Sequence, residues 1–252
     1  MADLSQHART LRSLHFGPEP LLLPNAWDVA SARVVAEAGF PVIATSSHAV
    51  AASLGYPDAD AMPADVAFAA VARIAAGVDL PVTADLEAGY GLAAPQFVER
   101  LLGAGAVGCN LEDTDHHGDE VLRPMELQEE WLHAVRAAAE AAGVPIVINA
   151  RIDVFIRQYG DAGSRVTEAI RRGKAYMAAG ADCLYPIGLT DRDAIATFVQ
   201  SVAAPVNIWL RPDGPSRAEL AALGVARISL AAGLFRQAMT GLRQALDVLR
   251  AS

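Results

Sequence analysis

Acidic residues gather just after several short aliphatic segments of this chain, and their spacing predicts a site for a divalent cation. Asp85 and Glu87 follow one such segment and alternate by two, so they share one face of extended backbone. Glu112 ends another segment, and Asp58 lies in a loop after a third. Carboxylates that converge repel one another, which raises their pKa values. A hard cation relieves this repulsion, and such oxygen ligands suit Mg²⁺, with Mn²⁺ as the alternative.

The aliphatic segments belong to a unit that recurs along the chain. Each unit has a short strand, a polar or glycine-containing loop, an Ala-rich helix, and a Gly or Pro before the next strand. Eight such units without a break in composition predict an α/β fold, a closed (β/α)8 TIM barrel that spans residues 1–252 as a single domain. An open doubly wound sheet is the alternative, but it usually carries a glycine-rich phosphate fingerprint after its first strand. Here that strand runs into Pro24-Asn25-Ala26-Trp27-Asp28.

The strands and helices can be placed from this pattern. We expect strands near residues 21–23, 41–45, 80–85, 107–111, 145–150, 182–185, 205–210 and 226–230. We expect helices near residues 31–38, 64–76, 128–142, 164–179, 191–202, 216–223 and 234–249, another after Pro95, and a long loop between residues 45 and 64. Active sites of TIM barrels lie at the C-terminal ends of the strands. One loop acid there would be an ordinary solvated side chain, whereas three acidic clusters at successive strand ends predict a site.

Composition restricts the function further. The formal net charge of −9 argues against nucleic acid or an anionic membrane as the main partner, since both need a positive surface. A small anionic substrate remains compatible, because a metal or a local cation overrides the global field. Cys109 and Cys183 lie in apolar segments and are expected to be buried, reduced thiols. The first residues form no apolar signal core, and no apolar run approaches the ~20 residues of a membrane span, so we expect a cytoplasmic protein.

Four motifs along the chain resemble those of the isocitrate lyase / phosphoenolpyruvate mutase superfamily. They stand in the right order at the expected strand ends, and the similarity runs from about Leu21 to Leu234. The resemblance implies a (β/α)8 barrel enzyme that uses Mg²⁺ to stabilise an enolate of a small 2-oxo acid. The motifs are Ser46-Ser47-His48 with Gly55-Tyr56-Pro57-Asp58, Asp85-Leu86-Glu87-Ala88-Gly89-Tyr90-Gly91, Leu111-Glu112-Asp113, and Asn149-Ala150-Arg151-Ile152-Asp153.

The resemblance also assigns roles to these residues. Asp85 would be the direct Mg²⁺ ligand, and three further acids would hold metal-bound waters: Asp58, Glu87 and Glu112. Arg151 would grip a substrate carboxylate or phosphonate, for which a guanidinium fork is suited, and its alternative is an ion pair with Asp153 or Asp161. Backbone amides of three consecutive residues would bind another substrate oxygen: Ser46, Ser47 and His48. The His48 side chain is a further candidate for a direct role.

The loop after the fourth strand departs from the resemblance. Isocitrate and 2-methylisocitrate lyases carry Lys-Lys-Cys-Gly-His there, with Cys as proton donor, and the mutases carry Lys-Thr-Asn. Here residues 113–120 contain neither Cys nor Lys. The lyases also place Glu after Pro on the sixth strand, where this chain has Ile187. A true isocitrate lyase is therefore not expected. His116 and His117 are candidates for the acid–base work beside Arg151 and Glu112, or else two exposed loop histidines.

Two further residues are predicted to reach the substrate. Asn207 on the seventh strand matches an Asn of the lyases that contacts substrate, and Trp27 at the first strand end either lines the pocket or packs. Arg211 could add a second anion clamp or simply pair with Asp213. The expected activity is C–C cleavage next to a 2-oxo acid of the oxaloacetate type, with P–C chemistry on a phosphonopyruvate-like substrate as a second possibility. A metabolite-binding barrel that keeps the metal site without turnover is the alternative from another class.

The last predicted helix, residues 234–249, is amphipathic. It could pack on its own barrel. Related proteins exchange this helix between subunits, so the resemblance implies a homodimer or a homotetramer.

Overall fold

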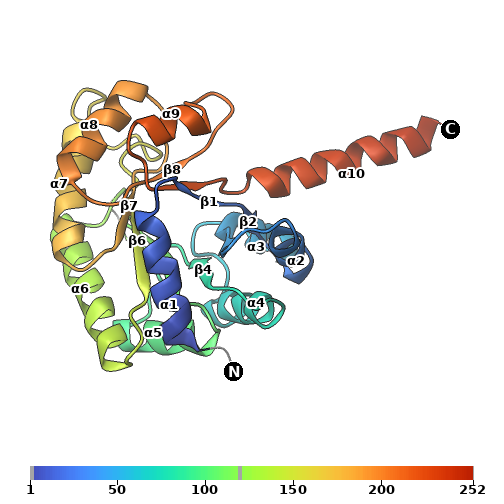
Figure 1. Cartoon of the computed structure of the whole chain (residues 1–252), viewed down its shortest axis with the longest axis horizontal. Coiled ribbons are helices and arrows are strands. Elements are labelled where there is room, and N and C mark those ends of the chain that lie inside the picture. Colours follow the sequence, from blue (N-terminus) through green and yellow to red (C-terminus); the bar gives the residue numbers. More distant parts are fainter. Residues whose placement is uncertain (1–2, 119–120, 252) are drawn as a thin grey trace.

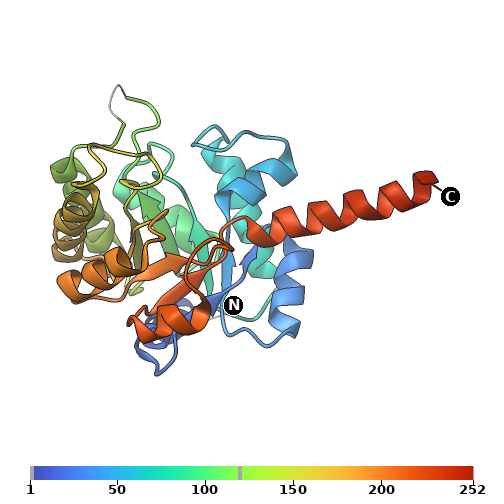
Figure 2. The ribbon, with the colours of Figure 1, turned by 90° about the horizontal axis from the view of Figure 1, so that it is seen from above.

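The computed structural model describes residues 3–118 and 121–251 and shows a closed ring of parallel strands surrounded by helices (Figures 1 and 2). Strands β2 to β7 pair in chain order, and β9 pairs with β1 on one side and with β8 on the other. Pro24 separates β1 from β2, which are two halves of one strand of the ring, because proline has no N–H for the ladder. A parallel bridge between Leu184 and Val206 joins β7 to the start of β8. The predicted TIM barrel is thus confirmed.

The boundaries follow the predicted strand-and-helix alternation. The strands are β1 (Leu21–Leu23), β2 (Asn25–Ala26), β3 (Ile43–Thr45), β4 (Val82–Asp85), β5 (Gly108–Glu112), β6 (Val147–Arg151), β7 (Cys183–Tyr185), β8 (Asn207–Trp209) and β9 (Arg227–Ser229). The helices are α1 (Leu4–Ser13), the 3₁₀ turn η1 (Leu14–Phe16), α2 (Val29–Glu37), α3 (Ser47–Leu54), α4 (Ala64–Ala76), α5 (Ala94–Gly103), α6 (Met125–Ala141), α7 (Arg165–Ala178), α8 (Arg192–Val202), α9 (Arg217–Ala222) and α10 (Gly233–Ala251).

Two helices were not predicted. The segment read as a long loop after the second strand contains α3, which begins where the Ser46 side chain accepts a hydrogen bond from the Ala49 amide. Helix α1 precedes the barrel and begins at Asp3, whose side chain accepts from the Gln6 amide. Both helices are short, and each is recognised by its N-cap more readily than by an apolar repeat.

Helix α1 closes the amino end of the barrel. Its Leu11 is fully buried among residues that begin the strands, including Leu21, Val42 and Val107. Arg12 forms an ion pair with Asp182 and donates to two backbone carbonyls that precede β6. The amino end is therefore filled and paired, which leaves the carboxyl end as the open face.

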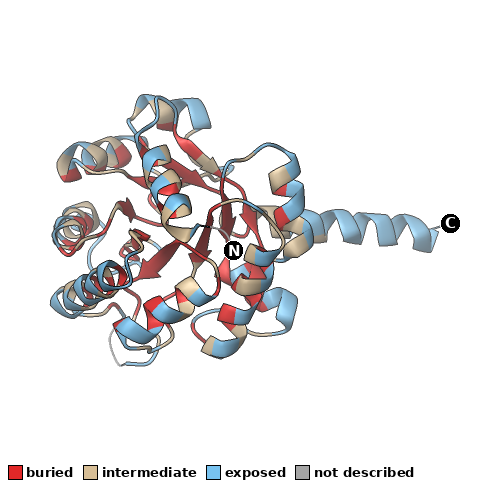
Figure 3. Ribbon diagram, turned by 60° about the horizontal axis from the view of Figure 1, so that its bottom comes forward, coloured by how far each residue is buried: buried red, intermediate tan, exposed pale blue. Residues whose placement is uncertain are grey.

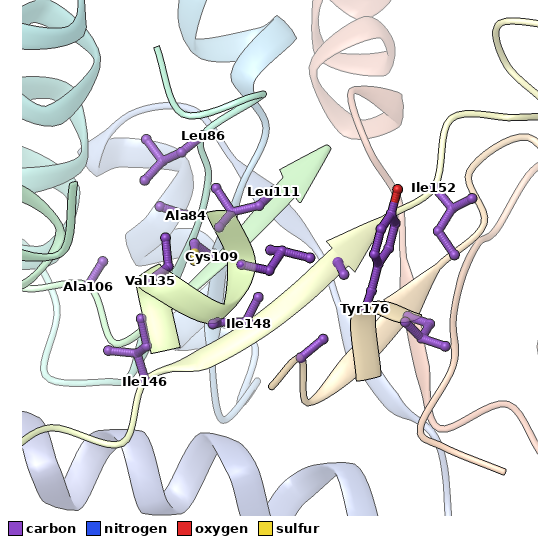
Figure 4. Packing of buried hydrophobic residues seen from close by; sticks show 14 of the residues in the cluster. Ala84, Leu86, Ala106, Cys109, Leu111, Val135, Ile146, Ile148, Ile152 and Tyr176 are labelled. Atoms are coloured by element: carbon purple, nitrogen blue, oxygen red, sulfur yellow. The ribbon is translucent and has the colours of Figure 1, made fainter. Parts of the chain in front are cut away.

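The main core lies between the strands and the surrounding helices. Figure 4 shows Cys109 and Leu111 of β5 and Ile148 of β6 packed beside Val135 of α6, and the buried strands at the centre of Figure 3 reflect the same layer. Cys109 and Cys183 are both buried and unpaired, as expected, and burial raises the pKa of each thiol to about 12. Such thiols are inert packing groups.

Helix α10 extends away from the barrel (Figures 1 and 3). None of its described residues is buried, and Leu242 and Leu246 are 53% and 49% exposed. Of the two alternatives for this helix, packing along its own barrel is therefore not the one seen in the structure. Its first turn contacts the barrel, where Phe235 meets Trp27 edge to face at 5.3 Å between ring centroids. In the described part of the chain, no helix combines the length and apolarity that crossing a membrane requires.

Candidate active site

Two adjoining polar hollows lie at the carboxyl ends of the strands. They share Ser47, Asp58, Arg151 and Ile156. Between them they are lined by all four acids predicted to surround the metal: Asp58, Asp85, Glu87 and Glu112. The sequence pattern therefore brought the right carboxylates to one place, although their roles remain predictions.

Asp85 is held by donors on both carboxylate oxygens. The Ser47 amide and hydroxyl donate to Oδ2 at 3.0 and 2.9 Å, and the Asn110 side-chain amide donates to Oδ1 at 3.2 Å. Ser47 is the first residue of α3, so the positive end of that helix faces the carboxylate. These contacts fix the orientation of Asp85.

Glu87 lies beyond β4 with a positive φ of 51°, a conformation that non-glycine residues seldom adopt. Nearby Gly89 has a φ of 88° and must be glycine, because an added Cβ would lie 2.5 Å from the Trp131 ring. Glu87 Oε2 accepts from the Asp60 amide and Oε1 from the Tyr90 hydroxyl at 3.2 Å. Burial, with the like charges of Glu112 and Asp60, raises the pKa of Glu87 to about 8.

Asp60 is the least compensated acid of the site. Its residue exposure is 8%, and neither carboxylate oxygen has a hydrogen-bond donor within the described structure. Burial raises its pKa, against the opposing charges of His116 and His117. The His117 ring lies 3.5 Å from its Oδ2 but is 62% exposed, so it compensates little. Such a buried carboxylate suits a cation ligand.

Glu112 connects a histidine and an arginine. Its Oε1 lies 2.6 Å from His116 Nε2, and its Oε2 contacts Arg151 Nη1. Burial raises the pKa of Glu112 to about 7, although Arg151 opposes the shift. Burial lowers the pKa of His116, but the hydrogen bond and charge of Glu112 outweigh it, so the net shift is upward. The pair can therefore exchange a proton near neutral pH.

Arg151 is fixed from behind by a second acid. Its Nε and Nη2 donate to the two oxygens of Asp153 at 2.7 and 3.0 Å. Asp153 also accepts from Thr114 at 2.5 Å, and its backbone amide donates to Asp113 at 2.8 Å. The ion pair with Asp153 considered from the sequence is thus present, and it aims the guanidinium at a hollow that it lines.

The donor set fits a divalent cation. Four acids from two strand ends and one loop line the hollows, and burial, with the neighbouring acids, raises the pKa values of Glu87 and Glu112. Ligand atoms of Asp60, Glu87 and His116 also lie within 4.8 Å of one another. This trio omits Asp85. We give it less weight, because His116 Nε2 is already hydrogen-bonded to Glu112 and Asp85 is the carboxylate oriented by three donors.

Comparison with known proteins agrees with this geometry. The family model described as phosphoenolpyruvate phosphomutase matches residues 11–250. The chain belongs to the phosphoenolpyruvate phosphomutase family. That family lies within the isocitrate lyase / phosphoenolpyruvate mutase superfamily, so the resemblance deduced from the four motifs is confirmed.

Family members with several activities are similar to this chain. An oxaloacetate decarboxylase of Rhodopseudomonas palustris is 28% identical over 247 residues, which cover 92% of this chain and 83% of the relative. A solved structure from Burkholderia cenocepacia with a provisional phosphonomutase assignment is 40% identical, has a TM-score of 0.90, and covers 96% and 99% of the two chains. The phosphoenolpyruvate phosphomutase of Streptomyces platensis is 27% identical, with a TM-score of 0.85 and coverages of 97% and 87%. The family is thus defined, and the substrate is left open.

Some residues that were predicted to form the site lie at the edge of the two hollows or outside them. Ser46 and His48 line one hollow, but the Ser46 amide donates to Ala26 and the His48 ring lies 3.0 Å from exposed Asp58. Trp27 lines neither polar hollow; it packs on Phe235, as the packing alternative held. Asn207 is completely buried inside the barrel and lines neither hollow. A direct substrate contact by either residue therefore finds no support in this geometry.

Arg211 forms the ion pair that was the alternative to an anion clamp. Its Nε and Nη2 donate to the two carboxylate oxygens of Asp213, each at 2.8 Å. The guanidinium also lies over the Trp209 ring, 4.8 Å from its centroid.

Several residues in or near the two hollows were not predicted from the sequence. Asp60 stands two residues after Asp58, and this spacing was the available signal for it. Tyr185 and Arg236 line the hollow beside Asp85, from the end of β7 and the first turn of α10. Arg227 is a lone charged residue in an apolar strand, a pattern that predicts an unusual buried cation.

Proposed function

We propose that this protein is a divalent-metal-dependent enzyme that cleaves a C–C bond next to a small 2-oxo acid of the oxaloacetate type. The observation that supports it is the convergence of oriented Asp85, three further acids and Arg151 on adjoining hollows. Family membership and the similarity to an oxaloacetate decarboxylase point to the same reaction class. P–C chemistry is the second candidate, favoured by the similarity to a phosphoenolpyruvate phosphomutase.

In this proposal Asp85 holds the cation, Mg²⁺ or Mn²⁺, directly. Asp58, Glu87 and Glu112 accept hydrogen bonds from its waters, a division that suits a cation which keeps part of its hydration. When bound, the cation supplies Lewis-acid stabilisation to the oxyanion that develops on a 2-oxo acid. Glu87 and Glu112 must lose their protons for this, and because their pKa values are raised, that loss needs a higher pH than it would in an ordinary glutamate.

The remaining residues bind substrate and carry a proton. Arg151, held in place by Asp153, presents a fixed positive charge to a substrate carboxylate, so little reorganisation is needed when charge develops. His116 receives or gives a proton at its ring, in exchange with Glu112 at 2.6 Å. His117 is exposed and lies against Asp60, so we assign it a supporting electrostatic role.

We also propose that α10 packs against a second copy of the chain. Leu242 and Leu246 form an exposed apolar stripe on this helix, and a homodimer or homotetramer would bury it. A cytoplasmic location remains a prediction.

The test is a turnover assay with and without Mg²⁺. Wild-type protein is incubated with oxaloacetate and, separately, with phosphonopyruvate, and products are followed by NMR. We expect oxaloacetate turnover that requires Mg²⁺ and falls about 1000-fold in Asp85→Ala, a loss equivalent to about 4 kcal/mol of transition-state stabilisation. Glu140→Ala, on the exposed outer face of α6, is the matched acid control and should retain activity.

Three outcomes would contradict the proposal. Equal turnover with and without the metal would remove the cation from the mechanism. Turnover of phosphonopyruvate alone would move the reaction to the P–C class. No turnover of either compound, combined with Mg²⁺-dependent protection against heat by oxaloacetate, would instead favour a binding protein.

A further inference from the structure

The middle of the barrel interior is polar. TIM barrels usually fill this space with branched aliphatic side chains. Here the strand positions that face the axis carry a threonine, three asparagines and an arginine: Thr83, Asn110, Asn149, Asn207 and Arg227. The arginine pairs in register with Leu21, which belongs to the interior cluster beneath it.

Arg227 is a buried cation without an acidic partner. Its exposure is 1%, and no ion pair among the described residues includes it. Its Nη2 donates to Asn110 Oδ1 at 3.2 Å, whereas its Nε and Nη1 have no acceptor in the described structure. An unpaired charge in such a place is costly, so its presence in the barrel calls for a function.

Asn110 connects this arginine to the candidate metal ligand. The Asn110 Oδ1 atom accepts from Arg227 and from Asn149 Nδ2, the latter at 2.8 Å. Because two donors face Oδ1, the amide nitrogen must point the other way, where it donates to Asp85 Oδ1 at 3.2 Å. The side chain of Asn110 therefore connects Arg227 to Asp85, and no ion pair among the described residues joins the two.

We propose that Arg227 is a positioning residue whose buried charge, held one side chain below Asp85, makes tight metal binding depend on an anionic substrate. This inference rests on the proposed function in one respect, that Asp85 binds the metal. A divalent cation at Asp85 meets the repulsion of a fixed positive charge, which burial away from bulk water strengthens. A substrate anion above the metal offsets that repulsion.

The coupling has to work in both directions. If substrate strengthens metal binding by a given factor, metal strengthens substrate binding by the same factor. Because a fixed charge adds to each binding energy separately, removing the charge of Arg227 should strengthen metal binding by the same factor with and without substrate, and should weaken the binding of the anionic substrate.

The experiment measures Mg²⁺ affinity by calorimetry, alone and with saturating oxalate, a small dianion whose adjacent carboxylates resemble a 2-oxo acid. The variants are Arg227→Met, which removes the charge, and Arg227→Lys, which keeps it. Arg171→Met, on the exposed surface of α7, is the matched control for loss of one positive charge. Arg227→Gln replaces the Met variant if that variant does not accumulate folded.

We expect Arg227→Met to bind Mg²⁺ about 5-fold more tightly than wild type, both alone and with saturating oxalate. Arg227→Lys should keep both wild-type values, which a purely structural role for the guanidinium would not allow. The control should also match wild type.

The two proposals fail in different ways. Wild-type values in Arg227→Met, or an Arg227→Lys variant that behaves like Arg227→Met, would overturn this inference alone, provided that Asp85→Ala loses Mg²⁺ binding. Mg²⁺ binding that survives in Asp85→Ala would overturn the proposed function, and this inference with it.

Discussion

The two ends of the barrel are built on opposite principles. At the amino end, α1 seals the strands with apolar contacts, and Asp182 accepts hydrogen bonds from Arg12, from Arg136 and from the Ile148 amide. At the carboxyl end, Asp60 is buried without a donor and Glu87 is forced toward its neutral form. The amino end is thus arranged for stability, whereas the carboxyl end holds buried acids that reduce stability. This division is common in enzymes.

The largest expected effect tests the amino end. Leu11→Ala removes a fully buried side chain beneath the strands and should lower the free energy of unfolding by about 3 kcal/mol. The measurement is urea denaturation, with Mg²⁺ binding measured on the folded variant. Leu127→Ala, 57% exposed on α6, is the control and should change stability little. If Leu11→Ala lowers the free energy of Mg²⁺ binding by more than it lowers the free energy of unfolding, the two ends of the barrel are coupled. The comparison between them then does not hold.

The next effect tests the carboxyl end by pH. The pKa of Glu87 is about 8 in the folded chain and near 4.5 in the unfolded chain, so between these values only the folded state holds the proton. Stability of the metal-free protein should therefore fall as pH rises, by about 2 kcal/mol from pH 6 to pH 8. Urea denaturation at both pH values measures it, with Glu87→Gln as the comparison. A fall of the same size in Glu87→Gln would locate the cause elsewhere.

A smaller effect of opposite sign is expected from the amino end. His15 is buried beneath the barrel, and burial, helped by the charge of Arg227, lowers its pKa to about 4. Between pH 4 and 6.5 the His15 ring binds a proton in the unfolded chain but not in the folded chain. The free energy of unfolding should therefore fall as pH falls. The expected loss between pH 6 and pH 5 is about 1 kcal/mol relative to His15→Gln. Identical pH dependence in protein and variant would show that His15 does not titrate in this way.

The periodic parts of the fold and the acids at the strand ends could be predicted from the sequence. Helix α4 was predicted with the bounds it has, and the four carboxylates line adjoining hollows, because strand ends of a parallel barrel must share one face. What it could not supply were contacts between distant segments. The unpaired state of Asp60 depends on a loop with a positive φ of 56°, and the isolation of Arg227 depends on which side chains the closed ring sets around it.

The course of α10 has a consequence for how the protein behaves in solution. A lone helix of this length is only marginally stable in water, since most helical stability in proteins comes from packing of an apolar face. Leu242 and Leu246 face outward, so if α10 packs against a second copy as we propose, the order of this arm depends on how often another protomer is near. The melting temperature of α10 should then depend on protein concentration, so that dilution alone unfolds this helix while the barrel stays folded.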